Sequence, residues 1–439
     1  MTRLRSIWDD INSNYWFYPA LFALTAFLLA TFTVSLDRSG WSQWLASEEW
    51  AHPARPESAS NMLTIIAGSM IGVASTVFSI TIAAVAYASG NCGPRLLTNF
   101  MEDKGNQLSL ATFLGTFVFA LTVLRSVRTS SEQPMIELAG VGTQISGFVP
   151  QLSLLVAYGL MGLSIAVRVF FLNHIPASIR INTVLEGIGT RLINDIREMF
   201  PEPAKGEVEM RTASGKAVEA IDTGYVQAID LKRLTRATEE AGGCLAVSVR
   251  TGDFVHPAVP LAHWGESQLP EALHDDEVRA CFVLGGMRTP AQDLHFLFDE
   301  LVEIGLRALS PGINDPFTAI TALHWLGAAV AELGQRDLAR TFADADSESG
   351  ESLVLLQGDY AHFVDRSFGA IRTAIATSPA AATVTLETMI NAGRTLEDET
   401  RGKVLLTEMD QLVRQARLKL TGPDLEKVEA RYQAIRARS

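Results

Sequence analysis

The run Met62-Leu-Thr-Ile-Ile-Ala-Gly-Ser-Met-Ile-Gly-Val-Ala-Ser-Thr-Val-Phe-Ser-Ile-Thr-Ile-Ala-Ala-Val-Ala-Tyr-Ala88 decides what kind of protein this chain is. It contains no Asp, Glu, Lys, Arg or His. A helix needs about 20 consecutive apolar residues to cross the hydrocarbon core of a bilayer, and this run is longer than that. The sequence therefore predicts a membrane-spanning helix here.

Three further apolar runs extend this prediction to a transmembrane domain. The four predicted spans are Trp16–Leu36, Met62–Ala88, Leu108–Leu124 and Leu152–Leu172. The expected fold class is a mainly α membrane protein, with four transmembrane helices followed by a cytoplasmic α+β region and then an all-α soluble region. The expected domains are residues 1–175 in the membrane, residues 176–270 as a helical stalk and a small hairpin-bearing α+β domain, and residues 271–439 as a helical cytoplasmic domain.

Lys and Arg residues near the ends of the spans predict the orientation. An even number of spans places both termini on one side of the membrane. That side carries Arg3, Arg5, Arg95, Lys104, Arg168 and Arg180, against Arg38, Arg55, Arg125 and Arg128 on the other. The positive-inside rule then predicts cytoplasmic N- and C-termini, in the cytoplasmic (inner) membrane of a bacterium.

Composition excludes several classes of function. The net charge of −13 and the lack of a basic cluster argue against nucleic acid as a partner. The three cysteines are far apart and the eight histidines show no paired ligand spacing, so no metal site is expected. No nucleophile–base signature occurs, so we expect no catalytic residues, no cofactor and no enzyme.

Small and hydroxyl-bearing residues share one face of the second span and one face of the third. They are Ser69, Gly72, Thr76, Ser79, Ala83 and Ala86 in the second span, and Thr112, Gly115, Phe119, Thr122 and Arg125 in the third. Two interpretations remain open. These faces pack against other helices, or one of them lines a water-filled path in a homo-oligomer, where hydroxyls replace part of the hydration shell of an ion. Arg125 is either a functional charge or an anchor to the lipid headgroups.

The region after the spans begins with a predicted helical extension of the fourth span, Ile181–Phe200. Ala217–Ile229 is predicted as a strand or a hairpin around Gly224. Asp230 is the expected N-cap of a helix that ends at Gly242-Gly243, and an extended segment containing His256 follows. A histidine in such a segment binds a ligand or is structural.

A sharp corner between two helices is predicted at Ser310-Pro-Gly-Ile-Asn-Asp-Pro-Phe-Thr318, where Asp315 caps the second helix and Pro316 fills its first position. Five polar residues meet at this corner, which is either structural or a ligand site: Arg307, Ser310, Asn314, Asp315 and Thr318. In the preceding helix, Asp299 and Glu303 lie one turn apart, and we expect a solvated face there rather than a catalytic pair.

Three stretches resemble a bacterial predicted membrane-protein family catalogued as domain of unknown function 2254. They are Ser69–Ile80 leading to Pro94-Arg95-Leu96-Leu97, then Gly252-Asp-Phe-Val-His-Pro257, and Leu309-Ser-Pro-Gly-Ile-Asn-Asp-Pro-Phe-Thr-Ala319. Gly93 and Ala258 depart from the Ser and Gly that this family often has. The resemblance implies four spans and a soluble domain, and it implies no activity.

Two hypotheses for function follow. The first is a homo-oligomeric ion channel or pore that the cytoplasmic domain gates. The alternative is a membrane-anchored sensor or scaffold that binds a ligand or a protein partner. Both place the chain in a lipid bilayer, and neither identifies the ion or small ligand.

Overall fold

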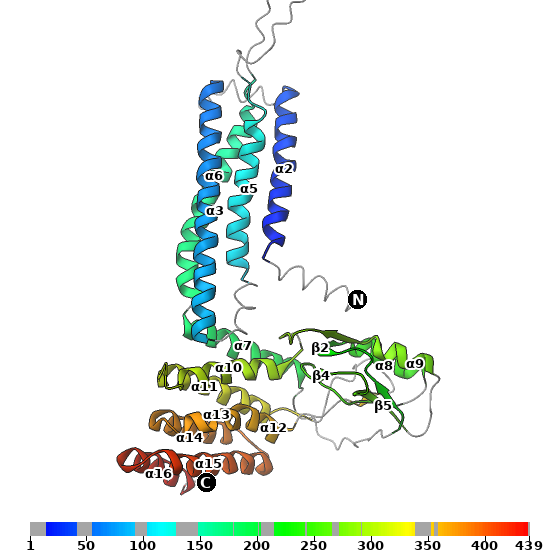
Figure 1. Cartoon of the computed structure of the whole chain (residues 1–439), viewed down its shortest axis with the longest axis vertical. Helices are drawn as coiled ribbons and strands as arrows, with labels where there is room; N and C mark the ends of the chain where they lie inside the picture. Colours follow the sequence, from blue (N-terminus) through cyan, green and yellow to red (C-terminus); the bar gives the residue numbers. More distant parts are fainter. Residues whose placement is uncertain are drawn as a thin grey trace, which may run out of the picture. The chain divides into compact units, whose positions relative to one another are not determined.

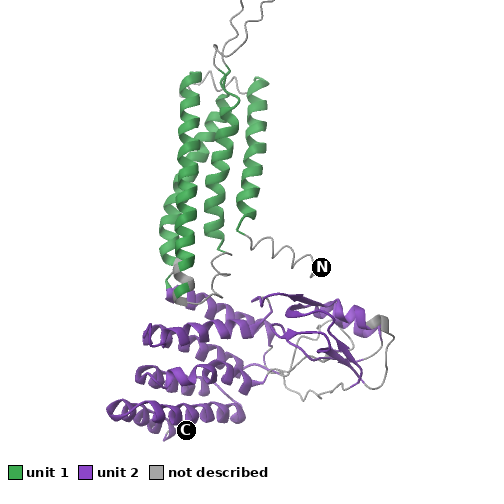
Figure 2. Cartoon of the chain, in the orientation of Figure 1, with its two compact units in different colours: residues 1, 3–180 green, residues 2, 181–439 purple. Residues whose placement is uncertain are grey.

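The computed structural model describes residues 15–41, 55–92, 103–128, 148–178, 180–200, 202, 215–241, 244–265, 272–290, 292–338, 353–354 and 359–437. The chain forms two compact units (Figure 2). Unit 1 consists of residues 3–180 and unit 2 of residues 181–439. The segment Pro94–Leu97, which contributes to the resemblance, lies outside the described residues.

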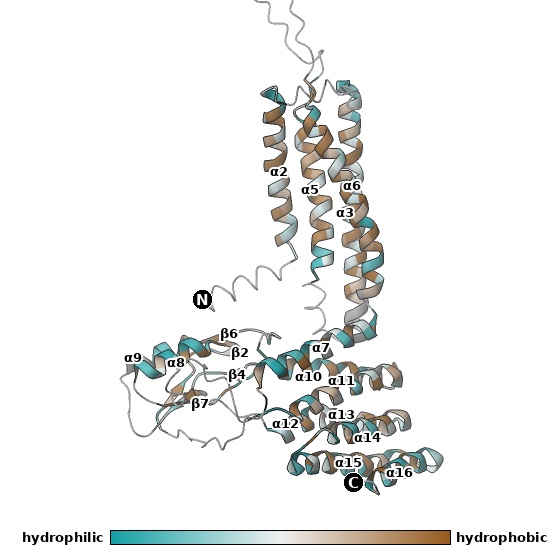
Figure 3. Ribbon diagram, turned by 180° about the vertical axis from the view of Figure 1, so that it is seen from behind, coloured by the Kyte–Doolittle hydropathy of each residue, from teal (hydrophilic) through white to brown (hydrophobic). Residues whose placement is uncertain are grey.

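Unit 1 is a bundle of four long helices that coincide with the four predicted spans (Figure 1). They are α2 (Phe17–Arg38), α3 (Pro56–Cys92), α5 (Lys104–Leu124) and α6 (Gln151–Ser178). Helix α5 contacts all three of the others and is the most buried of the four. Figure 3 shows that hydrophobic residues predominate along these helices, and many of them are exposed, such as Leu28, Ile65 and Val169.

The interior of unit 1 is built around bulky residues of α5. Phe113, Phe119 and Val123 are fully buried, and Ala30 and Leu63 from neighbouring helices pack into the same cluster. Alanines of α2 and α3 in this cluster, such as Ala30 and Ala67, let these backbones approach α5 closely.

Five described helices are long and apolar enough to cross a membrane, because α11 (Pro316–Gly334) also meets that criterion. Helix α11, however, belongs to unit 2, where it packs mainly against α7, α10 and α14. Ala322, Leu326, Ala329 and Leu333 are fully buried there. Its apolar character is that of a helix at the centre of a helical core.

The helical part of unit 2 consists of short helices stacked in layers (Figure 1). Besides α11, it contains α7 (Ile181–Met199), α10 (Leu294–Ala308), α12 (Tyr360–Val364), the π-helix η2 (Asp365–Gly369), α13 (Ala370–Ile375), α14 (Pro379–Gly393), α15 (Glu399–Lys419) and α16 (Gly422–Arg436). The predicted corner is confirmed, because Asp315 accepts hydrogen bonds from the amides of Phe317 and Thr318 and Pro316 opens α11.

The α+β part of unit 2 contains two small sheets. Its elements are β1 (Ala217–Glu219), β2 (Gly224–Ile229), α8 (Leu231–Glu240), β3 (Leu245–Val247), β4 (Phe254–Val255), β5 (Pro260–Trp264), α9 (Ala272–Arg279), β6 (Phe282–Gly285) and β7 (Leu353–Val354). One sheet has the order β1-β5-β3-β7 and the other β4-β2-β6. Trp264 is fully buried in their shared core and donates its indole N–H to Asp275, 3.1 Å away. Asp230 caps α8, as predicted.

Two expectations about this region are wrong. Strands β1 and β2 do not form a hairpin around Gly224, because β1 pairs with β5 while β2 pairs with β4 and β6. The fourth span does not continue as one helix into the next segment. Helix α6 ends at Ser178, two residues after Pro176, and α7 begins at Ile181. Pro176 lies inside α6, where it removes one backbone hydrogen bond of the last turns.

The contact between α7 and α11 depends on one glycine. A Cβ atom on Gly189 would lie 2.2 Å from the indole ring of Trp325. We expect Gly189→Ala to lower the free energy of unfolding by about 1–3 kcal/mol, because the ring has to move out of a packed core. Chemical denaturation of the full chain measures this effect.

The matched control lies two residues away on the same helix. A Cβ on Gly187 meets nothing within 4 Å, so Gly187→Ala should be neutral or stabilise slightly through helix propensity. Equal effects of the two substitutions would contradict the packing argument.

Candidate functional site

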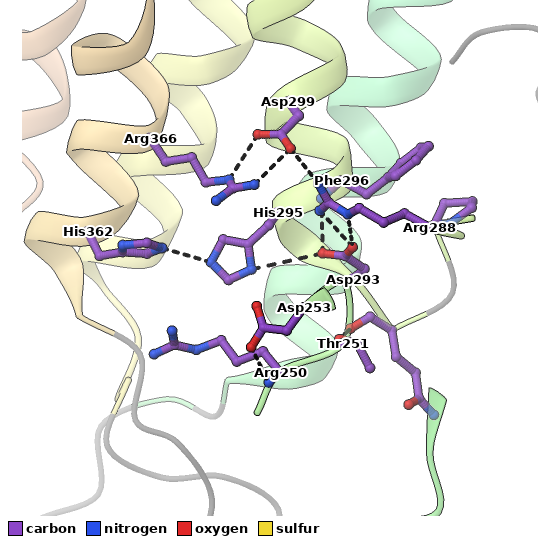
Figure 4. A network of polar contacts seen from close by, with 12 residues as sticks. Arg250, Thr251, Asp253, Arg288, Asp293, His295, Phe296, Asp299, His362 and Arg366 are labelled. Atoms are coloured by element: carbon purple, nitrogen blue, oxygen red, sulfur yellow. Dashed lines mark hydrogen bonds and ion pairs between the residues drawn. The ribbon is translucent and has the colours of Figure 1, made fainter. Parts of the chain in front are cut away.

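Asp299 on α10 lies at the centre of a buried polar network in unit 2 (Figure 4). It accepts two hydrogen bonds from Arg366 of η2, at 2.9 and 2.7 Å, and one from Arg288 at 2.7 Å. Burial acts to raise the pKa of Asp299, but the hydrogen bonds from Arg366 and Arg288 outweigh it and lower this pKa below its ordinary value. The carboxylate is therefore held ionised between two guanidinium groups.

A second carboxylate, Asp293, joins the network to the N-terminus of α10. Its side chain is 1% exposed, caps α10 through the amide of Phe296, and lies 2.7 Å from Arg288. Arg288 thus bridges two carboxylates, one at the start of the helix and one along it. A charge buried to this degree is tolerated only when it is paired and hydrogen-bonded.

The turn Thr251-Gly252-Asp253 packs directly on this network from the α+β part. Gly252 has a φ of +91°, and a Cβ there would lie 2.2 Å from Asp293 Oδ2. Thr251 donates a hydrogen bond to the carbonyl of Gln292, at 2.5 Å. The glycine supplies both the left-handed backbone and the space that this approach requires. Gly252 is also the first residue of Gly252–Pro257, one of the three stretches that resemble the membrane-protein family, so this stretch begins at the polar network.

Two histidines extend the network towards α12. His295 Nε2 and His362 Nε2 are 3.1 Å apart, so one ring donates and the other accepts. Burial and the nearby charge of Arg366 lower the pKa of His295 to about 3, and burial and Arg250 lower the pKa of His362. Both rings are therefore neutral near pH 7. His295 also stacks on Phe363, with ring centroids 5.3 Å apart.

The histidine pair lies among groups of both charges, with Arg366 and Arg250 nearby and the carboxylate of Asp293 3.9 Å from His295 Nδ1. Figure 4 shows Arg366 on one side of the pair and Arg250 on the other. Both arginines contribute to keeping the rings neutral. Among the described residues, no group of three His, Cys, Asp or Glu side chains has the geometry to hold a metal ion.

The expectation that Asp299 belongs to a solvated face is wrong. Its partner Arg366 lies 67 positions later in the chain and Arg288 lies 11 positions earlier, outside the helix. The spacing of Asp299 and Glu303 on one helix contains no information about either arginine. Sequence reasoning also missed His295 and His362, because they become neighbours only when α10 and α12 pack together.

The corner residues of the prediction come together as expected, and they satisfy one another. Asp315 accepts a hydrogen bond from the hydroxyl of Thr318 at 2.6 Å, and Ser310 donates to the carbonyl of Arg307 at 2.6 Å. The amide of Asn314 donates to Ser310 O, with Asn314 at a φ of +48°. These hydrogen bonds hold the turn that connects α10 to α11, which favours a structural role for the corner.

Two other predicted residues lie apart from the network. His256 is exposed, and its imidazole Nδ1 lies 2.8 Å from the carbonyl oxygen of the adjacent Pro257. Arg125 forms the C-cap of α5 at the end of the bundle. The structure thus brings neither side chain into a cluster with the other predicted site residues.

The two predicted small-residue faces have different surroundings. On α5, Thr112 is buried and a Cβ on Gly115 would lie 3.4 Å from Phe22 of α2, while Thr122 is half-buried. The α5 face therefore packs within unit 1. The residues of the α3 face are exposed: Ser69, Gly72, Thr76, Ser79, Ala83 and Ala86.

Polar pairs at the ends of the bundle escaped the sequence analysis. Asp37 at the end of α2 accepts hydrogen bonds from the amides of Leu152 and Ser153, each at 3.0 Å, and so caps α6. At the opposite end of α6, His174 lies 2.8 Å from Asp103, which caps α5. Each pair joins residues that are far apart in the chain. In each pair, the aspartate also accepts hydrogen bonds from backbone amides at a helix N-terminus, which have no partner within the helix.

Comparison with known proteins places these features in a family. The model of a family described as predicted membrane protein (DUF2254) matches residues 12–391. Uncharacterized protein Mb1321c of Mycobacterium bovis and uncharacterized protein Rv1290c of Mycobacterium tuberculosis are each 27% identical to this chain over 371 residues. Each match covers 82% of this chain and 68% of the relative. No solved structure matches the chain.

Removal of the central carboxylate tests the network. We expect Asp299→Asn to lower the free energy of unfolding by about 3 kcal/mol, because two half-buried guanidinium groups lose their shared counter-charge. Asp276→Asn is the control, since Asp276 is 78% exposed in its ion pair with Arg279 and should cost less than about 1 kcal/mol. Denaturant titration of both variants against the unmodified chain measures the difference, and a small effect at Asp299 would contradict the network's role.

The histidine pair predicts a dependence of stability on pH. The pKa of His295 is about 3 in the folded state, below its ordinary value of 6.5. As pH falls below 6.5, the unfolded chain binds this proton first, so the folded state loses stability at up to about 1.4 kcal/mol per pH unit. Above pH 6.5 the ring is neutral in both the folded and the unfolded chain, so the stability lost at lower pH is fully retained.

His295→Phe removes the titrating group and keeps a ring that can stack on Phe363. The difference in unfolding free energy between the variant and the unmodified chain should therefore shift in favour of the variant as pH falls from 6.5 to about 5. Denaturant midpoints at a series of pH values measure it. A difference that stays constant with pH would overturn the assignment.

Proposed function

The chain belongs to the family of predicted membrane proteins designated DUF2254, and we propose that it is a four-span homo-oligomer in which α3 lines a passive path for ions. In this proposal α2, α3, α5 and α6 cross the bacterial cytoplasmic membrane, and both termini and unit 2 are cytoplasmic. Unit 2 gates the path.

One observation carries the proposal: the small-residue face of α3 has no partner within the described part of unit 1. Gly72, Thr76 and Ser79 are exposed, whereas Met70, Ala74 and Val77 on the opposite face of the helix are buried. A Cβ on Gly72 would meet nothing within 4 Å. Within a bilayer such a face packs on another helix, borders water or leaves a shallow groove for lipid.

The spacing of the face favours assembly of several copies around one axis. Its residues follow one another at alternating intervals of three and four positions, from Ser69 to Ala86. Alternating steps of three and four form the seven-residue repeat at which helices cross with a left-handed supercoil. Small side chains at those positions permit a close approach between copies.

The hydroxyl groups on this face suit a path for cations. Thr76 donates its proton to the carbonyl of Gly72 at 2.9 Å, and Ser79 donates to the carbonyl of Ser75 at 2.9 Å. A hydroxyl whose donor is used in this way still has lone pairs on its oxygen. Oxygen atoms of this kind can replace part of the hydration shell of a cation.

Passive conduction fits the helices better than coupled transport. Most residues of α2, α3, α5 and α6 that carry charge or an imidazole lie towards the helix ends, as Asp37, Lys104 and His174 do, and Arg168 lies ten residues before the end of α6. Proton-coupled transporters and pumps usually carry such groups near the middle of the membrane.

A second candidate function is a membrane-anchored sensor or scaffold. The observation that favours it is the histidine pair, His295 and His362, which lies between Arg250 and Arg366 and is the candidate site for a ligand. In that case the helices of unit 1 only anchor the protein, and the α3 face packs against a second copy.

Cysteine substitution separates the pore from a packed interface. In a chain without its native cysteines, Thr76→Cys and Ser79→Cys should become sensitive to a charged, water-soluble methanethiosulfonate reagent. Because the modified side chains lie in the path, the current through planar bilayers should fall on modification. Single-channel recording measures this current.

The control is Phe78→Cys, one position before Ser79 and 46% exposed on a different face of the same helix. It should not react, because it faces lipid. A well-behaved oligomer that shows no current, with Thr76→Cys forming disulfide-linked dimers instead, would refute the channel and favour the anchored sensor or scaffold.

A further inference from the structure

The corner between α10 and α11 exposes large apolar side chains in unit 2. Phe317 is 77% exposed and Ile313 is 46% exposed, and Leu306 in the last turn of α10 is 40% exposed. A single exposed apolar residue on a protein surface is ordinary. Three within twelve positions around one corner form an apolar tip, and the question is what covers it.

The corner holds these side chains rigidly. The amide of Asp315 donates to the carbonyl of Ala308 at 2.8 Å, which closes the loop, and Asp315 caps the first turn of α11 through Phe317 and Thr318. Ile313 and Phe317 flank this closed turn. The hydrogen bonds therefore fix the backbone that carries Ile313 and Phe317 and leave the two side chains exposed at the tip.

The apolar tip lies at the end of the helical stack where the chain enters unit 2. A Cβ on Gly189 of α7 would touch Trp325 of α11, and further along Arg197 pairs with Glu332 at 2.9 Å. The two helices therefore run in the same direction. Extending this register back along both helices places Ile181, the first residue of α7, at the level of Phe317.

Chain connectivity keeps that end close to the membrane. Only residues 179 and 180 separate Ile181 from Ser178, the last residue of α6. Three peptide units span at most about 11 Å. The apolar run of α6 continues to Leu172, so the start of α7 lies within a few turns of the hydrocarbon edge whatever direction α7 takes.

We propose that the apolar tip of the α10–α11 corner, formed by Ile313 and Phe317 with Leu306 behind them, inserts into the lipid headgroup layer on the side of the membrane where α6 ends. Aromatic and aliphatic side chains gain free energy on moving from water into this layer. Contact with the surface would also hold unit 2 at a second point besides α7. The inference requires α6 to span the bilayer and does not require the protein to conduct ions.

A depth measurement on the full chain tests the inference. In a chain without its native cysteines, Phe317→Cys is labelled with the environment-sensitive fluorophore NBD and reconstituted into phosphatidylcholine vesicles with and without 5-doxyl phosphatidylcholine. Insertion predicts a blue-shifted emission and a loss of fluorescence in the doxyl vesicles, because the nitroxide quenches only at short range.

Leu418 provides the matched control, since it has the same exposed fraction of 77% and lies near the end of α15 in another layer of unit 2. NBD on Leu418→Cys should show neither the shift nor the quenching. Equal behaviour of the two labels would overturn the proposal. So would spin labels on Phe317→Cys that broaden one another without any quenching by lipid, because a second copy of the chain would then cover the tip.

Discussion

Unit 1 is shaped by the cost of an unpaired polar group in hydrocarbon. Inside a bilayer every backbone amide and carbonyl has to be satisfied within the protein, and α2, α3, α5 and α6 do this through their own helical hydrogen bonds. The same cost applies to side chains. Thr76 and Ser79 bond to carbonyls one turn back along α3, and the exposed amides at the start of α6 are capped by Asp37. The surface of the bundle is mostly apolar, and its exposed hydroxyl groups include Thr25 and Thr31 of α2 as well as the small hydroxyl-bearing face of α3.

Unit 2 also contains paired charges, which are partly buried where its helical and α+β parts meet. Asp299 pairs with Arg288 and Arg366 at once, and Arg288 also pairs with a second carboxylate, Asp293, at the start of α10. Pairing at this density is costly to break and does little for net stability compared with apolar packing. It does join elements from three separate stretches of chain, namely the Gly252 turn, α10 and η2. The histidine pair, His295 and His362, borders this junction.

Much of the local structure could be predicted from residue patterns. The four apolar runs coincide with α2, α3, α5 and α6, Asp230 and Asp315 cap the helices expected of them, and Pro316 opens α11. These features depend on residues close together in the chain. The hairpin around Gly224 was wrong because strand pairing is decided by distant partners, β5 for β1 and β6 for β2. The solvated face assigned to Asp299 was wrong for the same reason.

The sequence by itself determined which segments are apolar helices and which residues share a helix face, and it identified the caps Asp230 and Asp315, because these follow from hydropathy, the helical period and capping. Only the tertiary structure decided which of the two small-residue faces, that of α3 or that of α5, packs against another helix of unit 1. The small residues of α5 meet α2 within the unit, while those of α3 remain exposed. It alone brought His295 to His362 and both arginines to Asp299. Such contacts join residues many positions apart, and they form only when packed helices bring their side chains within hydrogen-bond distance.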